Sequence, residues 1–252
     1  FIYDSINQYR SDNTVSEGQM TDSATPTFSA SDTLTSHERS SDQNIGTIIS
    51  GVADRDAIEY AVGSSVTANA AAVYFTGDDN VSSGTIMNFF VDTDRASLPN
   101  KGTITAVSAA GWATTDLTET TGTKFFVEFT GAVTNVSEVL IGSKLSFEVE
   151  PDVNIQSSID YENSIQRSLG GVEYALNVNT GQEVTTIGFQ NISSTFKTNL
   201  TTMQDALKGE AKKFVWYDGT SFHWVRLDKP MKFTEIADGR FSTQLVLRQQ
   251  IQ

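Results

Sequence analysis

Residues 212 to 227, KKFVWYDGTSFHWVRL, decide the fold class of this chain. Large apolar side chains alternate on both sides of Asp218-Gly219, a dipeptide that tolerates the positive φ values of a tight β-turn. We therefore predict a β-hairpin with two largely apolar faces, which is typical of strands that are covered on both sides. The pattern favours the interior of a sheet over a stacking platform for a ligand. The core residues that it predicts are Phe214, Trp216, Phe222 and Trp224.

One amphipathic helix is predicted before this hairpin, at about residues 194 to 208. Its four apolar residues recur at spacings of four, three and four, which places them on one stripe that would pack on a sheet. Ser194 is a candidate N-cap, and Gly209 stands where a left-handed C-cap would end the helix. Two strand candidates, VEYALNV and EVTTIGFQNIS, precede the helix and are joined at residues 179 to 181. The predicted core residues of the helix are Phe196, Leu200, Met203 and Leu207.

Residues 56 to 150 contain short β-rich runs separated by Gly, Asn, Asp and Ser. In KFFVEFT, for example, Phe125, Val127 and Phe129 share one face of a strand. Repeated short strands with turn residues between them predict a β-sandwich. Residues 1 to about 50 are rich in Ser, Thr and Asp. We expect an irregular polar arm there, or an arm that becomes ordered only against a neighbouring subunit.

A domain boundary is predicted near residues 151 to 160, where Pro151 ends the last strand-like run and the charge balance changes. Residues 1 to 155 contain 21 Asp and Glu against 7 Lys and Arg, whereas residues 156 to 252 contain 10 of each. We therefore predict a mainly β chain with two β-sandwich domains. The first, at residues 1 to 155, is acidic and includes the arm, and the second, at residues 156 to 252, carries the single helix.

Composition excludes several classes of partner and chemistry. The net charge of −14 repels phosphate backbones, so we expect no nucleic-acid partner. No stretch approaches the roughly 18 consecutive apolar residues that a membrane-spanning helix needs, so we expect no membrane partner. The chain has no cysteine, which excludes disulfides, thiolate metal sites and cysteine nucleophiles.

The residues that catalysis would need are scarce. The two histidines are His37, in the polar arm, and His223, in the predicted hairpin. A Ser-His-Asp relay needs a histidine beside the serine, and zinc usually needs several His or Cys ligands. The phosphate-binding patterns GxGxxG and GxxxxGK are absent. We therefore predict a non-catalytic protein without a cofactor, in which His223 is structural.

Calcium is the one metal for which the chain offers candidates, because calcium prefers oxygen ligands. The candidate aspartates lie in predicted turns and lack the spacing of an EF-hand loop, so they are more simply interpreted as turn residues exposed to solvent. The weak candidates are Asp78, Asp79, Asp92 and Asp94.

Trp112 has two interpretations that the sequence leaves open. It is flanked by Gly and Thr in AAGWATTD, as in a loop that exposes a tryptophan for stacking on a sugar. A core tryptophan at the end of a strand has the same surroundings. Trp112 is therefore a candidate glycan contact and a candidate core residue.

The order of features after about residue 165 is that of a known family. A strand pair is followed by a helix, a FVW strand, a hairpin, an Arg-containing strand with P.F after it, and a last strand written G.F...L.L. This resembles the C-terminal region of tail-tip and minor tail proteins of long-tailed bacteriophages, including distal tail proteins. The resemblance implies a β-sandwich with one packed helix. The residues that carry it are Gly209, Phe214, Val215, Trp216, Arg226, Pro230, Phe233, Gly239, Phe241, Leu245 and Leu247.

The first part contains AAVYFTG, NFFVDTD and VSEVLIGSKLSFEVEPD. These runs are similar to galactose-binding-like, discoidin-type sandwiches of phage tail proteins. In those proteins an EI.IG..L segment links the sandwich to the next domain of the chain. The residues that match this segment are Glu138, Ile141, Gly142 and Leu145.

The two resemblances together imply a structural component of a bacteriophage virion, placed in the tail as a distal-tail or baseplate adaptor. The implied partners are other virion tail proteins and further copies of the chain, in a homo-oligomeric ring that commonly has six copies in this family. The alternative is a carbohydrate-binding module or host-recognition protein whose first sandwich binds glycan, for example through Trp112.

Overall fold

The computed structural model describes residues 1–3, 14–20, 28–30, 49–51, 55–76, 86–92, 98–105, 110–131, 133–151, 155–161, 163–167, 173–177 and 181–250. Over these residues the chain is mainly β, with antiparallel sheets that form a sandwich and a single helix. The predicted fold class is confirmed. Within the described residues, no helix has the length and the apolar character needed to cross a membrane.

The chain divides into two compact units. The first unit comprises Phe1–Leu145 together with Tyr217–Phe222. The second comprises Ser146–Trp216 and His223–Ile251. The first unit therefore ends before the boundary that the sequence predicts.

The position of this boundary follows from two apolar residues that are close in sequence. Leu145, the last residue of the first unit, is buried. Phe147 packs in the second unit, where its ring centroid is 4.9 Å from that of Phe189 and 6.5 Å from that of Phe196. The chain thus changes unit before Pro151, and the composition changes only afterwards.

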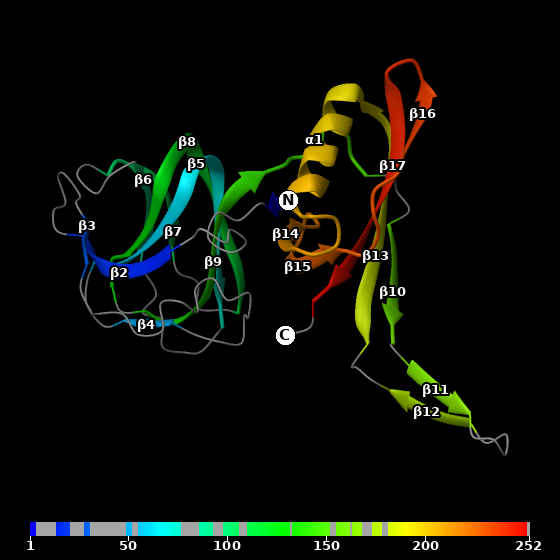
Figure 1. Cartoon of the computed structure of the whole chain (residues 1–252), viewed down its shortest axis with the longest axis horizontal. Helices are drawn as coiled ribbons and strands as arrows, with labels where there is room; N and C mark the ends of the chain where they lie inside the picture. Colours follow the sequence, from blue (N-terminus) through cyan, green and yellow to red (C-terminus); the bar gives the residue numbers. More distant parts are fainter. Residues whose placement is uncertain are drawn as a thin grey trace. The chain divides into compact units, whose positions relative to one another are not determined.

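Two long strands belong to both layers of the first unit (Figure 1). β5 (Asp56–Phe75) and β8 (Gly111–Phe129) pair with each other along both halves, with a register shift between Ala61 and Val66. A register shift of this kind bends a strand, so that its two halves enter different layers. The first half of β5 and the second half of β8 form one layer, and the remaining halves form the other. The layers are completed by β2 (Thr14–Met20), β6 (Ile86–Asp92) and β7 (Asn100–Thr105) on the first side, and by β9 (Val133–Lys144) on the second.

The interior of the first unit is filled by the apolar face of these strands. Phe125, Val127 and Phe129 all lie in one core cluster, as their predicted alternation requires. Glu128 lies between them in sequence and points to the other face. The largest fully buried side chains of the cluster are Tyr60, Phe75, Phe89, Phe125 and Phe129.

The described parts of the N-terminal arm form strands, which corrects the expectation of an irregular arm. β2 pairs with the first half of β5, and β3 (Phe28–Ala30) pairs with β2. β1 (Ile2–Tyr3) and β4 (Ile49–Gly51) each pair with β9. Pairing along a sheet edge needs backbone N–H and C=O groups more than large side chains, so a segment rich in Ser and Thr can take part. The rest of the arm, His37 included, lies outside the described residues.

The second unit is built on an antiparallel sheet with the strand order β10-β13-β17-β15-β14 (Figure 1). Another strand, β16 (Phe233–Ala237), pairs with the first part of β17. β12 (Glu173–Asn177) pairs with β11 (Asn163–Arg167), whereas β13 pairs with β10. The two strands that the sequence joins at residues 179 to 181 are therefore not partners. The sheet strands are β10 (Gln156–Asp160), β13 (Gln182–Ser193), β17 (Arg240–Gln249), β15 (Phe222–Leu227) and β14 (Lys213–Tyr217).

Helix α1 (Ser194–Ala206) is the helix that the apolar stripe predicts. Its N-cap is Ser193, one residue before the predicted one, because the Ser193 hydroxyl accepts a hydrogen bond from the Phe196 N–H at 3.0 Å. At the other end Gly209 has φ +67°, and its N–H donates to the Gln204 carbonyl at 2.9 Å. The first left-handed residue is Lys208, at φ +53° directly after the C-cap Leu207, so the helix ends one residue earlier than predicted and Gly209 follows in the same conformation.

Candidate functional site

The two tryptophans of the hairpin β14–β15 are buried. Trp216 is 7% exposed and Trp224 is 4% exposed. The Trp216 indole packs against His223 of the neighbouring strand, with the ring centroids 5.3 Å apart. Neither tryptophan presents a ring face on which a ligand could stack, so both occupy core positions.

The tip of the hairpin differs from its base. Phe222, which the sequence places in the core, is half-buried, because it lies beside the turn. Its ring packs on Tyr217 with the centroids 4.5 Å apart, and Tyr217 is 46% exposed. The Asp218 carboxylate accepts hydrogen bonds from the N–H groups of Thr220 and Ser221, both at 2.7 Å, and so closes the turn.

The other predicted core residues lie in the interior of the second unit. Phe196 contacts Phe189 edge to face, with the ring centroids 6.3 Å apart, which ties α1 to the sheet. The remaining buried residues of this group are Leu200, Met203, Leu207 and Phe214.

Trp112 lies within strand β8 and not in a loop. It is 8% exposed, and its ring packs against Tyr74 in a T-shaped arrangement with the centroids 5.3 Å apart. The structure therefore favours the core interpretation of Trp112. A buried indole leaves no open face for a sugar.

The predicted calcium ligands do not come together in the described part of the chain. Asp78, Asp79 and Asp94 lie outside the described residues, and Asp92 is the last residue of β6. No group of three or more His, Cys, Asp or Glu side chains that could hold a metal ion is found among the residues that are described.

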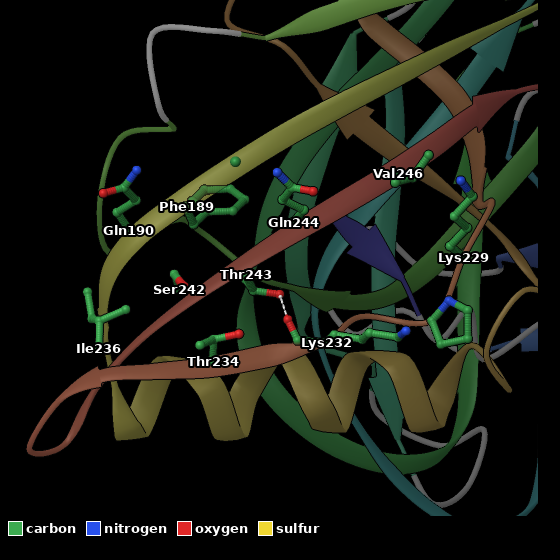
Figure 2. A pocket seen from close by; sticks show the side chains of 12 residues that line it. Phe189, Gln190, Lys229, Lys232, Thr234, Ile236, Ser242, Thr243, Gln244 and Val246 are labelled. Atoms are coloured by element: carbon green, nitrogen blue, oxygen red, sulfur yellow. Dashed lines mark hydrogen bonds between the residues drawn. The ribbon is translucent and has the colours of Figure 1, made fainter.

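An open groove with a volume of about 750 Å³ lies on the sheet of the second unit (Figure 2). It is lined by residues of β13, β16, β17 and the segment between β15 and β16. None of the patterns considered in the sequence predicts this groove. Its lining residues are Gly188, Phe189, Gln190, Lys229, Pro230, Lys232, Thr234, Ile236, Ser242, Thr243, Gln244 and Val246.

The groove follows from the alternation of side chains along β13 and β17. Phe189 pairs with Thr243, and both side chains are buried on the face that α1 covers. The next pair along the strands, Gly188 and Gln244, points to the opposite face. Because Gly188 has no side chain, the backbone of β13 is left uncovered there. The groove is thus a shallow part of an uncovered sheet face.

The chemistry of the groove is that of a binding surface. Its charged residues are Lys229 and Lys232, both exposed, and its lining contains no Asp, Glu or His. Hydroxyl and amide groups accompany the lysines, and Thr243 donates a hydrogen bond to the Lys232 carbonyl at 2.9 Å.

Arg248 fixes the edge strand of the same sheet. Its guanidinium donates to Asp228 at 2.5 Å, to Asp160 of β10 at 2.8 Å and to Gln182 at 3.3 Å. The hydrogen bonds to Asp228 and then Asp160 raise the pKa of the Arg248 guanidinium above its usual value. Arg248 thus joins three separate segments through one buried cation.

A polar row on the first unit is a second candidate site. The buried carboxylate of Glu128 accepts hydrogen bonds from Arg55 at 2.7 Å and from Asn88 at 2.9 Å. The Asn88 side-chain oxygen in turn accepts from Asn100 and Thr103, both at 3.1 Å. The row crosses β8, β6 and β7, and its outer members, Asn100 and Thr103, are exposed to solvent. Arg55 has φ +69°, a conformation that non-glycine residues seldom adopt.

No protein-family model matches this chain, and no curated protein matches its sequence. Its fold is similar to several solved carbohydrate-binding modules. The family 32 module of AlyQ in complex with 4,5-unsaturated mannuronic acid is 23% identical, with a TM-score of 0.36 over 41% of this chain and 83% of that one.

Two further modules give similar values. A fucose-binding module of Streptococcus pneumoniae is 14% identical, with a TM-score of 0.39 over 56% of this chain and 95% of that one. The family 32 module of C. perfringens NanJ in complex with galactose is 12% identical, with a TM-score of 0.39 over 54% of this chain and 96% of that one. The likeness concerns the fold, and it does not assign a ligand to this chain.

Proposed function

We propose that this chain is a non-catalytic structural component of a bacteriophage tail tip, of the distal-tail adaptor kind. The observation that carries the proposal is the uncovered edge of the second unit. β10 ends the sheet, and each of its five residues is exposed. An edge strand of this kind presents N–H and C=O groups that can pair with another chain.

Apolar side chains gather at the same edge. Ile155, Ile159 and Tyr161 are 48%, 62% and 51% exposed, and all three lie in or beside β10. Large apolar side chains exposed beside a free strand are typical of a protein–protein interface.

The positions that resemble tail proteins have structural roles in this unit. Phe214 and Trp216 lie in β14, Phe241 and Leu245 lie in β17, and Gly239 has φ +66° in the turn between β16 and β17. These roles support the tail-tip proposal, because they explain why such positions would be shared within one fold. The location in the virion and the ring of copies are parts of the same proposal.

The proposal is tested by the mass of the purified chain over a range of concentrations, together with electron microscopy of the particles. We expect a closed multimer. The double variant Ile159→Asp/Tyr161→Asp tests the edge itself. It places like charges there and should give smaller particles. A chain that stays monomeric at every concentration would contradict the proposal.

Glycan binding by the first unit is the second candidate function. The polar row favours it, because exposed amide and hydroxyl groups held by a buried carboxylate are suited to bind sugar hydroxyls. A glycan array probed with the full chain tests this function. Binding that is lost in Asn100→Ala and Thr103→Ala, and kept in Thr67→Ala on another surface, would support the second candidate.

A further inference from the structure

The groove on the second unit is basic and lacks acidic groups. Lys229 and Lys232 are both exposed, and no ion pair to either is found among the residues that the structure describes. Gln190 and Gln244 add amide groups that can each donate and accept hydrogen bonds. A ligand that neutralises this lining carries negative charge.

The floor of the groove is shaped for a polypeptide. Gly188 is not among the described glycines with positive φ, so the backbone conformation does not require glycine there. A glycine inside a strand often marks a place where another backbone or a ligand approaches closely. Val246 (Figure 2) supplies an apolar side chain beside the polar groups. Pro230 is a second apolar residue of the lining. The aromatic residue of the lining, Phe189, is 1% exposed, so the groove has no ring on which a sugar could stack.

The chain itself carries the complementary charge. Residues 1 to 145 have 18 acids against 7 basic residues, whereas residues 146 to 252 have 13 acids against 10 basic residues. Among the described acids of the first unit, Glu119 of β8 is exposed, and the exposed Asp116 is already paired with Lys144 at 2.6 Å.

We propose that the groove binds the acidic first unit of a second copy of this chain, with carboxylates of that copy paired to Lys229 and Lys232. The inference rests on the proposed assembly function and adds a second contact between copies, separate from the one at the β10 edge. The donor and acceptor surfaces differ, so the contact is head-to-tail, and repetition gives a ring if the rotation closes. The contact is electrostatic at an exposed surface, so salt weakens it.

Charge reversal tests the groove in the full chain. Sedimentation velocity measures association of Lys229→Glu/Lys232→Glu at low and high salt, beside the parent. We expect the dissociation constant to rise at least about tenfold, because opposed like charges at an interface cost several kcal/mol. Gly188→Leu, which fills the floor without a change of charge, should weaken association too. The single reversals Lys229→Glu and Lys232→Glu are each compared with Lys208→Glu, which makes the same change of charge at an exposed lysine outside the lining.

Cross-linking identifies the occupant. Copies labelled with ¹⁵N are mixed with unlabelled copies and treated with a carbodiimide, which joins amines to carboxylates without a spacer. We expect links from Lys229 or Lys232 of one copy to Asp or Glu within residues 1 to 145 of the other. Links that stay within one copy, or that reach only residues 146 to 252, would overturn the inference.

The outcomes separate the two proposals. If the groove variants associate like the parent and no link between copies involves Lys229 or Lys232, the inference fails while the assembly function stands. If the parent is monomeric throughout, both fail. A loss of association that is equally large in Lys208→Glu would also overturn the inference, because it would reflect net charge alone.

Discussion

Two parts of the sheet in the second unit differ in how many of their faces are covered. At β14–β15 both faces are covered: Trp216 shares a face with His223, and Trp224, the next residue after His223, lies on the other face. At β13–β17 one face is covered. Phe189 is buried there, whereas Gln244 on the opposite face is exposed.

The difference is encoded in the pattern of side chains. KFVWY and FHWVRL carry large side chains at successive positions, which suits burial on two faces. TTIGFQ alternates large residues with Thr, Gly and Gln, which suits burial on one. An uncovered sheet face can therefore be predicted from the period of a strand.

The largest loss of stability is expected in the hairpin β14–β15, where both faces of the sheet are covered. Trp216→Ala and Trp224→Ala should each cost about 3 to 5 kcal/mol of unfolding free energy, the range for a large aromatic lost from a core. Thermal and chemical melts of the full chain measure this cost. A parent-like melt for one variant would mean that its face is not covered, and the contrast between the two parts of the sheet would weaken.

A smaller effect is expected at Arg248, the buried charge on the open side of the sheet. Arg248→Met should cost about 2 to 3 kcal/mol, because hydrogen bonds to charged groups contribute about 1.5 to 3 kcal/mol and Asp228 would lose its partner. Hydrogen exchange of β10 should rise in this variant, since Asp160 would lose its ion pair. The neighbouring Arg226→Met serves as a control, and an equal cost there would show that the three-way contact is unimportant.

The cap of α1 tests the helix that covers the closed face. Ser193→Ala should cost about 1 kcal/mol, because the Phe196 N–H loses its acceptor. Ser194→Ala, the cap that the sequence favours, should change stability by less than about 0.5 kcal/mol. The two variants differ by one position, and equal melts for both would show that the cap is not where the structure places it.

The smallest effect is expected on the open face. Gln244→Ala should change stability by less than about 0.5 kcal/mol, because its side chain is exposed and outside the core. Its neighbour Leu245 is fully buried, and Leu245→Ala should cost about 2 to 5 kcal/mol. A large cost for Gln244→Ala would show that the open face is covered in solution.

Local patterns were enough to predict most of the fold. The hairpin about Asp218-Gly219, the stripe from Phe196 to Leu207 and the alternation of Phe125, Val127 and Phe129 all depend on neighbours in sequence. The described strands of the arm were not predicted, because the pairing of β2 with β5 uses backbone groups whose partners are distant in the chain. β12 was joined to the wrong neighbour for another reason: its partner β11 is a short strand just before it in the chain that the sequence analysis did not identify.

The candidate site was harder to predict than the core. The groove brings together Gly188, Lys229 and Gln244, which are far apart in sequence and whose register depends on the whole sheet. The alternation in TTIGFQ could have indicated an open face, but not the lysines beside it. Trp112 kept two interpretations at the level of sequence, because the contact that distinguishes them comes from Tyr74 on a neighbouring strand.

The two long strands of the first unit have a consequence for how that unit folds. Because β5 and β8 run through both layers, neither layer can be completed without fixing residues of the other. We therefore expect one cooperative transition for the sandwich, with no state in which a single layer survives. The pairs involved are also distant in sequence, with Asp56 opposite Phe129, so loop closure must precede most of the gain from pairing. Folding of the sandwich should accordingly take on the order of milliseconds to seconds, the range of β-proteins dominated by non-local contacts.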